Sequence, residues 1–150
     1  MSNSTVLIAV GNRLMTDDAV ALAAAERLQP TLEEMGLKVV IAETDLSCAI
    51  HQIGPPHRII VLDAAISGRE VGSVWRVPRG EWCAQRSLGL SQHGFGLVEW
   101  MRLAEPRVVD VIGIEVADLG WGFGLSIALQ AELERIIADV VRNVVCIMKQ

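Results

Sequence analysis

Short apolar runs alternate along this chain with longer segments that have helical periodicity. The run "RIIVL", residues 58–62, is entirely apolar after its arginine, as expected of a strand that is buried on both faces of a sheet. Three other runs share its length and character: Thr5–Val10, Leu37–Ala42 and Val108–Ile114. Strands that alternate with helices predict an α/β fold, here a three-layer α/β/α sandwich with a twisted, mostly parallel sheet.

Helix-like segments occupy the intervals between these strands. The last one begins near Ser126, and its apolar residues recur at spacings of three and four, so we expect that face to pack on the sheet. The glycine-rich "LGWGFGLS" before it is typical of a tight turn that leads to a serine N-cap. The remaining elements are predicted with these bounds: helices at Asp18–Leu28, broken at Pro30, at Ser47–Ile53 and at Phe95–Ala104, and an extra edge strand at Ser73–Val77.

The composition indicates one compact domain over residues 1–150. The hydrophobic share is 51%, which suffices for a substantial core. The formal net charge is −5 and no dense Lys/Arg patch occurs, which argues against nucleic acid as a partner. No apolar run approaches the roughly 20 residues of a membrane span, and the first residues lack the features of a signal peptide. We therefore expect a soluble, cytoplasmic protein with no membrane contact, and a monomer.

The cysteines do not indicate a disulfide framework or a structural zinc site. The sequence has 3 of them, an odd number, and no C-x-x-C occurs. Cys146 lies on the apolar stripe of the last predicted helix and is expected to be a core residue. Cys48 lies in a predicted loop or helix start, where its thiol could be accessible.

Three polar residues are expected at one edge of the predicted sheet. Asp18 follows the first strand, Asp63 directly follows "RIIVL", and His93 precedes the helix that starts near Phe95. Right-handed crossovers place every strand-to-helix turn at the carboxyl edge of the sheet, where ligands of such folds bind. Two carboxylates and an imidazole that converge there would suit a divalent metal of borderline character.

Each of these residues also has a simpler interpretation. Spacing alone favours Asp17 and Asp18 as caps of the first helix, because carboxylates stabilise helix N-termini. Asp63 would then be an ordinary turn residue, and His93 an ordinary loop histidine. A hydrolase that uses Ser91, His93 and Asp63 is weakened by the absence of a G-x-S-x-G motif. A dinucleotide site is poorly supported because G-x-G-x-x-G is absent.

Four blocks of the sequence, in order and at matching intervals, resemble one protein family. They are "GNRLMTDD" at residues 11–18, "RIIVLDA" at 58–64, "SQHGFGL" at 91–97 and "GIEVADLGWGFGLS" at 113–126. Over roughly residues 7–137 the chain resembles the hydrogenase maturation proteases. These are the nickel-dependent endopeptidases that finish the large subunit of [NiFe] hydrogenases.

The resemblance implies that Asp18, Asp63 and His93 are both the metal ligands and the catalytic residues. Asp18 matches the family pattern better than Asp17, because the family's ligand is the second acidic residue. The implied substrate is a large-subunit precursor that already carries its nickel and loses a short C-terminal extension. The nickel would polarise the scissile carbonyl or activate a water molecule. Oxygen and imidazole ligands suit such a transient contact better than thiolates, which would hold nickel tightly.

The chain departs from the family pattern near the expected cleft. Ala19 and Ala21 follow the acidic pair where the family has glycines, "ETDLSCAI" replaces a D-G-G-T-like loop, and Val116 stands at a common proline position. These changes leave the candidate ligands intact and bear on the choice of partner. Two other functions stay open. One is a non-proteolytic module that senses or chaperones nickel for a hydrogenase large subunit, and the other is a conventional hydrolase that uses Ser91 or Cys48.

Overall fold

The computed structural model describes residues 4–43, 58–78, 108–117 and 120–150, and the fold is given for these. The strands in this part of the chain are β1 (Thr5–Val10), β2 (Leu37–Glu43), β3 (Arg58–Ala65), β4 (Val74–Val77) and β5 (Val108–Glu115). The helices are η1, a 3-10 helix at Thr16–Ala19, followed by α1 (Val20–Glu34) and α5 (Ile127–Met148).

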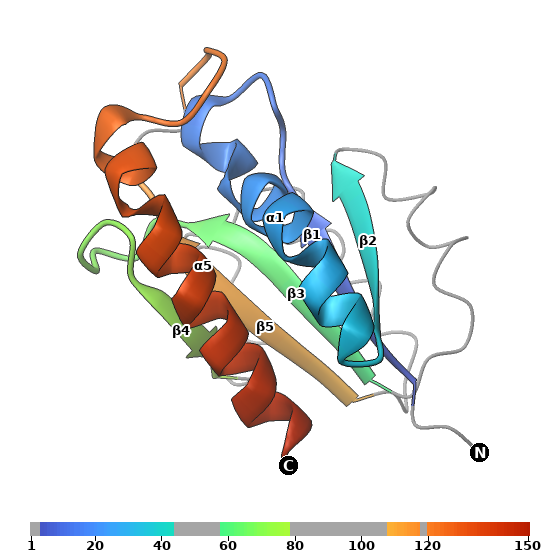
Figure 1. The fold of residues 1–150 in the computed structure, drawn as a ribbon. Coiled ribbons are helices and arrows are strands. Elements are labelled where there is room, and N and C mark those ends of the chain that lie inside the picture. Colours follow the sequence, from blue (N-terminus) through green and yellow to red (C-terminus); the bar gives the residue numbers. More distant parts are fainter. Residues whose placement is uncertain (1–3, 44–57, 79–107, 118–119) are drawn as a thin grey trace.

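The described strands form one sheet in the order β2-β1-β3-β5-β4 (Figure 1). The first four of these run parallel, and β4 is antiparallel to β5 at an edge. This arrangement confirms the predicted α/β fold, its mostly parallel sheet and its extra edge strand. The chain leaves β1 for β2 on one side and then places β3 on the other side of β1. The carboxyl ends of β1 and β3 therefore mark the topological switch point, where ligands bind in sheets of this kind.

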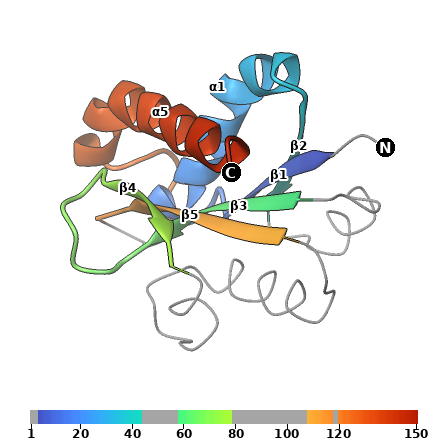
Figure 2. The same ribbon diagram turned by 90° about the horizontal axis from the view of Figure 1, so that it is seen from below.

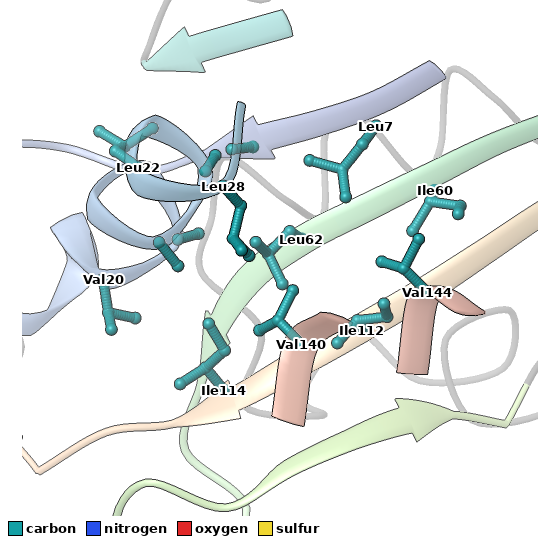
Figure 3. Close-up of a cluster of buried hydrophobic side chains, with 14 of the residues drawn as sticks. Leu7, Val20, Leu22, Leu28, Ile60, Leu62, Ile112, Ile114, Val140 and Val144 are labelled. Carbon is teal, nitrogen blue, oxygen red and sulfur yellow. The ribbon is translucent and has the colours of Figure 1, made fainter. Parts of the chain in front are cut away.

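The helices α1 and α5 lie side by side over one face of the sheet, as both ribbon views show (Figures 1 and 2). The core between these helices and the sheet combines small alanines of α1 with branched side chains from the sheet and from α5. Figure 3 shows part of this cluster, which includes Leu7, Leu22, Ile60, Leu62, Ile112, Ile114, Val140 and Val144. Burial of this core fixes the two helices on the sheet.

The opposite face of the sheet is buried as well. Because successive side chains of a strand point to opposite faces, a second cluster alternates with the first: Val6, Ile8, Val10, Val40, Ala42, Ile59, Val61, Val77 and Val111. Burial on both faces confirms the prediction made from the continuous apolar run of β3. The helices predicted at Ser47–Ile53 and Phe95–Ala104 lie outside the described residues, so one helical layer is described.

The first helix differs from its prediction at both ends. Asp18 lies in η1, α1 begins at Val20, and Pro30 lies inside α1, which continues to Glu34. A proline at this position removes one intrahelical hydrogen bond and crowds the carbonyl four residues earlier. The fully buried Leu32 lies beyond the proline and fixes the last turn against the sheet. The predicted break at Pro30 is therefore wrong, because burial of this turn outweighs the local cost of the proline.

Replacement of Pro30 by alanine is expected to raise the free energy of unfolding by about 1–2 kcal/mol. Alanine restores the missing N–H donor and relieves the ring clash. Part of this gain is lost because alanine gives the unfolded chain more conformational entropy than proline does. Pro30 is exposed, so the change disturbs no packing. Urea unfolding of Pro30→Ala, beside the exposed neighbour Thr31→Ala as control, measures the effect. A Pro30→Ala protein no more stable than the Thr31→Ala control would contradict this account.

The last helix begins where the sequence predicts, but one of its residues was misplaced. Ser126 is the N-cap of α5, and its side chain accepts a hydrogen bond from the backbone N–H of Leu129 at 3.3 Å. Cys146 is exposed, which corrects its prediction as a core residue. The buried stripe follows Val144 and Ile147, and a residue two positions after Val144 points about 200° away from it around the helix.

Within the described ranges, no helix combines the length and the apolar character that crossing a membrane requires.

Candidate active site

Asp18 lies in η1, directly after the turn that follows β1, and its side chain is almost completely buried. Its Oδ2 accepts a hydrogen bond from the backbone N–H of Asn12 at 2.9 Å. Its own N–H donates to the backbone oxygen of Met15 at 2.8 Å. The turn therefore curls back so that its own backbone orients the Asp18 carboxylate at the carboxyl end of β1.

Gly11 allows this turn to form. A Cβ atom placed on Gly11 would lie 2.1 Å from the backbone oxygen of Asp18, far inside any contact that real Cβ atoms make. Only glycine permits backbone to approach backbone this closely. The glycine of the "GNRLMTDD" block thus has a physical reason that local spacing does not show: it leaves room for the residue that carries the candidate ligand.

We expect Gly11→Ala to displace η1, to lower the free energy of unfolding by about 1–3 kcal/mol and to impair any activity that depends on Asp18. The methyl group collides with backbone, which cannot rotate away as a flexible side chain would. Gly68→Ala is the control, because Gly68 has a φ of +89° but open space around its Cβ position, so strain alone costs about 1–2 kcal/mol there. Thermal melts and an activity assay of both variants measure the difference. Equal activity in Gly11→Ala and the wild type would contradict the role of this close approach.

Asp63 lies within β3, two residues before its end, rather than directly after it as predicted. The strand is longer than the apolar run because Ala64 and Ala65 still pair with β5. Asp63 is fully buried, and its Oδ1 accepts a hydrogen bond from the N–H of Ala64 at 2.8 Å. Alternation along the strand places it on the face that Ile59 and Val61 share. A fully buried carboxylate is costly to maintain unless its oxygens are bonded, and the Ala64 N–H supplies one such bond.

The structure brings the elements that carry Asp18 and Asp63 together. Strands β1 and β3 are neighbours in the sheet, and η1 contacts β3. Both carboxylates therefore belong to the switch point between these two strands. His93, the third predicted ligand, lies outside the described residues. Among the residues that are described, no three His, Cys, Asp or Glu side chains are grouped to hold a metal ion. The metal site of Asp18, Asp63 and His93 therefore stays a prediction.

Asp17 has a different role from its neighbour. It is fully buried, and it accepts hydrogen bonds from the N–H of Ser126 at 2.7 Å, from the Ser126 hydroxyl at 2.9 Å and from the N–H of Ala117 at 3.1 Å. It thus joins η1 to the segment after β5 and to the N-terminus of α5. The N-cap of α1 is Ala19, and no side chain caps it or η1. The interpretation of the acidic pair as caps of the first helix is therefore wrong, because Asp17 serves the last helix instead.

Thr16 makes a second connection between the same two segments. Its N–H donates to the backbone oxygen of Gly122 at 3.0 Å, and its hydroxyl donates to that of Gly120 at 2.7 Å. Its φ is 36°, in the left-handed region that β-branched residues rarely adopt. These bonds hold the strained residue in place, so the turn before Asp18 depends on a loop more than 100 residues later.

Glu115 is a polar residue at this edge that the sequence reasoning missed. It ends β5, is buried, and accepts hydrogen bonds from the N–H and the hydroxyl of Ser67, at 2.9 and 2.5 Å. Its backbone oxygen accepts from the N–H of Gly72 at 2.8 Å, and its own N–H donates to the backbone oxygen of Ser73 at 2.8 Å. Glu115 therefore closes the loop of residues 66–73 that follows Asp63. The only signal in the sequence was its place in the "GIEVADLGWGFGLS" block.

Comparison with known proteins identifies the family. A family model described as hydrogenase maturation protease matches residues 22–143. The match spans most of the chain, and the protein belongs to the hydrogenase maturation protease family, which makes it a hydrolase of the endopeptidase class. Asp63 and His93 lie within the matched segment, and Asp18 lies just before it. No curated protein matches this sequence.

Solved structures of the same family share the fold. The [NiFe] hydrogenase maturation protease HybD from Thermococcus kodakarensis has a TM-score of 0.73 and 23% identity, with 93% of this chain and 97% of that chain covered. The hydrogenase maturating endopeptidase HybD from E. coli has a TM-score of 0.71 and 18% identity, with 93% and 91% covered. The maturation protease HycI from T. kodakarensis KOD1 has a TM-score of 0.70 and 19% identity, with the same coverage of 93% and 91%. At such low identities the likeness shows the fold.

Proposed function

We propose that this protein removes the C-terminal extension of a [NiFe] hydrogenase large-subunit precursor that already carries its nickel. One observation supports the proposal most directly. A member of the maturation protease family keeps two buried carboxylates, Asp18 and Asp63, at the switch point of its sheet. Two carboxylates on adjacent elements attract a cation placed between them, and burial strengthens that attraction. The nickel of the precursor is such a cation.

The donor set fits a transient contact with nickel. Asp18 and Asp63 supply oxygen, and His93 would supply an imidazole nitrogen, a mixture that suits divalent metals of borderline character. Cys146, the cysteine within the described residues, is exposed on α5 and away from this edge. Nickel held in this way would polarise the scissile carbonyl or activate water. We take nickel to be part of the substrate rather than a resident cofactor of this chain.

The residues of this chain contribute orientation and exclusion of water. The Asn12 and Ala64 N–H groups each bond one oxygen of a carboxylate, so that Asp18 and Asp63 keep fixed directions. Burial lowers the local dielectric and strengthens their attraction to a cation. The loop of residues 66–73, closed by Glu115, follows Asp63 and would form one wall of the path for the peptide tail.

A cleavage assay tests this function. Purified protein is mixed with a large-subunit precursor in nickel-loaded and nickel-free form, and the mass of the precursor is followed. The expected result is the loss of a C-terminal peptide from the nickel-loaded form only. Complex formation without any loss of mass would overturn the proposal and favour the alternative, a nickel-sensing or chaperone module that does not cut. A cytoplasmic location and a monomeric state stay predictions.

A further inference from the structure

Exposed apolar side chains gather at the edge of the sheet that carries the site. In the described part of the chain, six large hydrophobic residues are exposed, and Met35 alone lies at the amino edge. The others lie at the carboxyl edge: Leu14, Ile66, Trp121, Phe123 and Ile127. Exposed apolar groups in one place mark interaction surfaces more often than scattered ones do. We name Leu14, Trp121, Phe123 and Ile127 the apolar ridge.

The apolar ridge is built from two loops that are bonded to each other, together with Ile127, the first residue of α5. Figure 1 shows the loop after β1 and the loop before α5 projecting together beyond the sheet. Met15 and Gly122 form a parallel β-bridge, and the Gly122 N–H donates to the backbone oxygen of Leu14 at 2.9 Å. Trp121 is 79% exposed, Phe123 87% and Ile127 91%. The ridge is thus held by backbone bonds while its side chains reach into solvent, so a partner would bind it with little ordering cost.

The ridge is also attached to the candidate active site. Asp17 bonds Ser126, and Thr16 bonds Gly122, both in the second loop. Thr16 and Asp17 are the two residues before Asp18. A protein that binds the ridge therefore contacts the same two loops that hold the Asp18 carboxylate. The ridge therefore lies beside the candidate active site, where the body of a large substrate could contact it.

The chemistry of the ridge indicates an apolar protein surface as its partner. Residues 120–127, "GWGFGLSI", contain no charged side chain. The nearby guanidinium of Arg13 is hydrogen-bonded to Glu43 and to Glu26, and these bonds raise the pKa of Arg13 above its ordinary value. Nothing in this segment offers a phosphate or an acidic peptide a partner. Aromatic side chains such as tryptophan dominate the binding energy of protein interfaces.

We propose that the apolar ridge docks the folded body of the large-subunit precursor, so that the precursor's tail reaches Asp18 and Asp63. This inference rests on the proposed function, because it identifies the macromolecule that the site would cut. The ridge fixes the position of the precursor, and the carboxylates act on its tail. Loss of the ridge should weaken capture of the precursor without changing the chemistry at saturation.

Binding and cleavage, measured separately, test the docking surface. The probe is the purified nickel-loaded precursor, titrated against wild type, Trp121→Ser, Phe123→Ser and the control Met35→Ser, which removes an exposed apolar residue at the opposite edge. Each ridge variant is expected to raise Kd and KM roughly tenfold or more, with kcat, melting temperature and the Met35→Ser values near those of the wild type. Ridge variants that bind and cleave like the wild type would overturn the docking surface while the proposed function stands.

The same measurements separate the two proposals. If the precursor binds through the ridge but is not cut, the proposed function fails and the docking surface stands. If the wild type neither binds nor cuts the precursor, both proposals fail. The molar mass of the free protein then shows whether the ridge has another partner. A dimer that Phe123→Ser dissociates would assign the ridge to a second copy of the chain.

Discussion

Asp18→Asn and Asp63→Asn are each expected to leave a folded protein that no longer processes the precursor. Asparagine keeps the size of the side chain and one carbonyl oxygen, which can still accept from Asn12 or Ala64. The cost in unfolding free energy should therefore be about 1 kcal/mol or less. The amide is a poor metal ligand, and loss of a residue that merely supports a ligand already costs 10–100-fold. Loss of a ligand itself should lower the processing rate by roughly a hundredfold or more.

The mass assay under single-turnover conditions, with a thermal melt of each variant, measures this effect. Asp139→Asn is the matched control, because Asp139 is a partly exposed carboxylate of α5 that pairs with the exposed Arg135 and Arg142. Its loss should change stability by less than about 0.5 kcal/mol and leave processing intact. Ser91→Ala and Cys48→Ala should also process normally, since those residues belong to the alternative hydrolase. Wild-type processing by folded Asp18→Asn would remove Asp18 from the site.

The strands could be predicted from the sequence because burial on both faces leaves a local signal. The run "RIIVL" is entirely apolar after Arg58, and β3 begins at that arginine. The end of the strand was missed because Ala64 and Ala65 pair with β5. This pairing is a tertiary contact that the local sequence pattern does not predict. The same holds for Pro30. Its local cost predicted a break, whereas burial of Leu32 in the tertiary structure decided that α1 continues.

The candidate site was predictable in part, and for one physical reason. Crossover handedness places the ends of parallel strands at one edge, so a shared edge for the Asp18 and Asp63 elements follows from element order. That β1 and β3 are neighbours does not follow, and the structure shows it. The hydrogen-bond partners of each aspartate cannot be predicted from element order. Asp17 reaches Ser126, 109 residues away in sequence, and the spacing of the acidic pair suggested a cap on the nearer helix instead. His93 stays a prediction, because it lies outside the described residues.

Asp17→Ala is expected to have the opposite effect from Asp18→Asn: a large loss of stability. The carboxylate of Asp17 is fully buried and accepts from the N–H and hydroxyl of Ser126 and from the N–H of Ala117. Alanine leaves these donors without their acceptor. Each buried donor left unsatisfied costs about 1–3 kcal/mol, and water reaches part of this site, so the total should be about 2–4 kcal/mol. In a chain of this size that lowers the melting temperature by roughly 10 °C.

Urea unfolding at 25 °C measures this loss, with Asp139→Asn again as the control that removes a surface carboxylate. The stability of Asp17→Asn should fall between that of Asp17→Ala and that of the wild type. One of the two terminal groups of asparagine is a donor, and it would face the donors that Asp17 accepts from. At a temperature where Asp17→Ala is still folded, it should retain part of its processing rate, whereas folded Asp18→Asn should retain none that can be measured. The two adjacent aspartates would then be separated by function, one holding the turn against α5 and the other acting on the substrate. Unchanged stability of Asp17→Ala would contradict this division, because no other described contact ties the N-terminus of α5 to η1 through a buried charge.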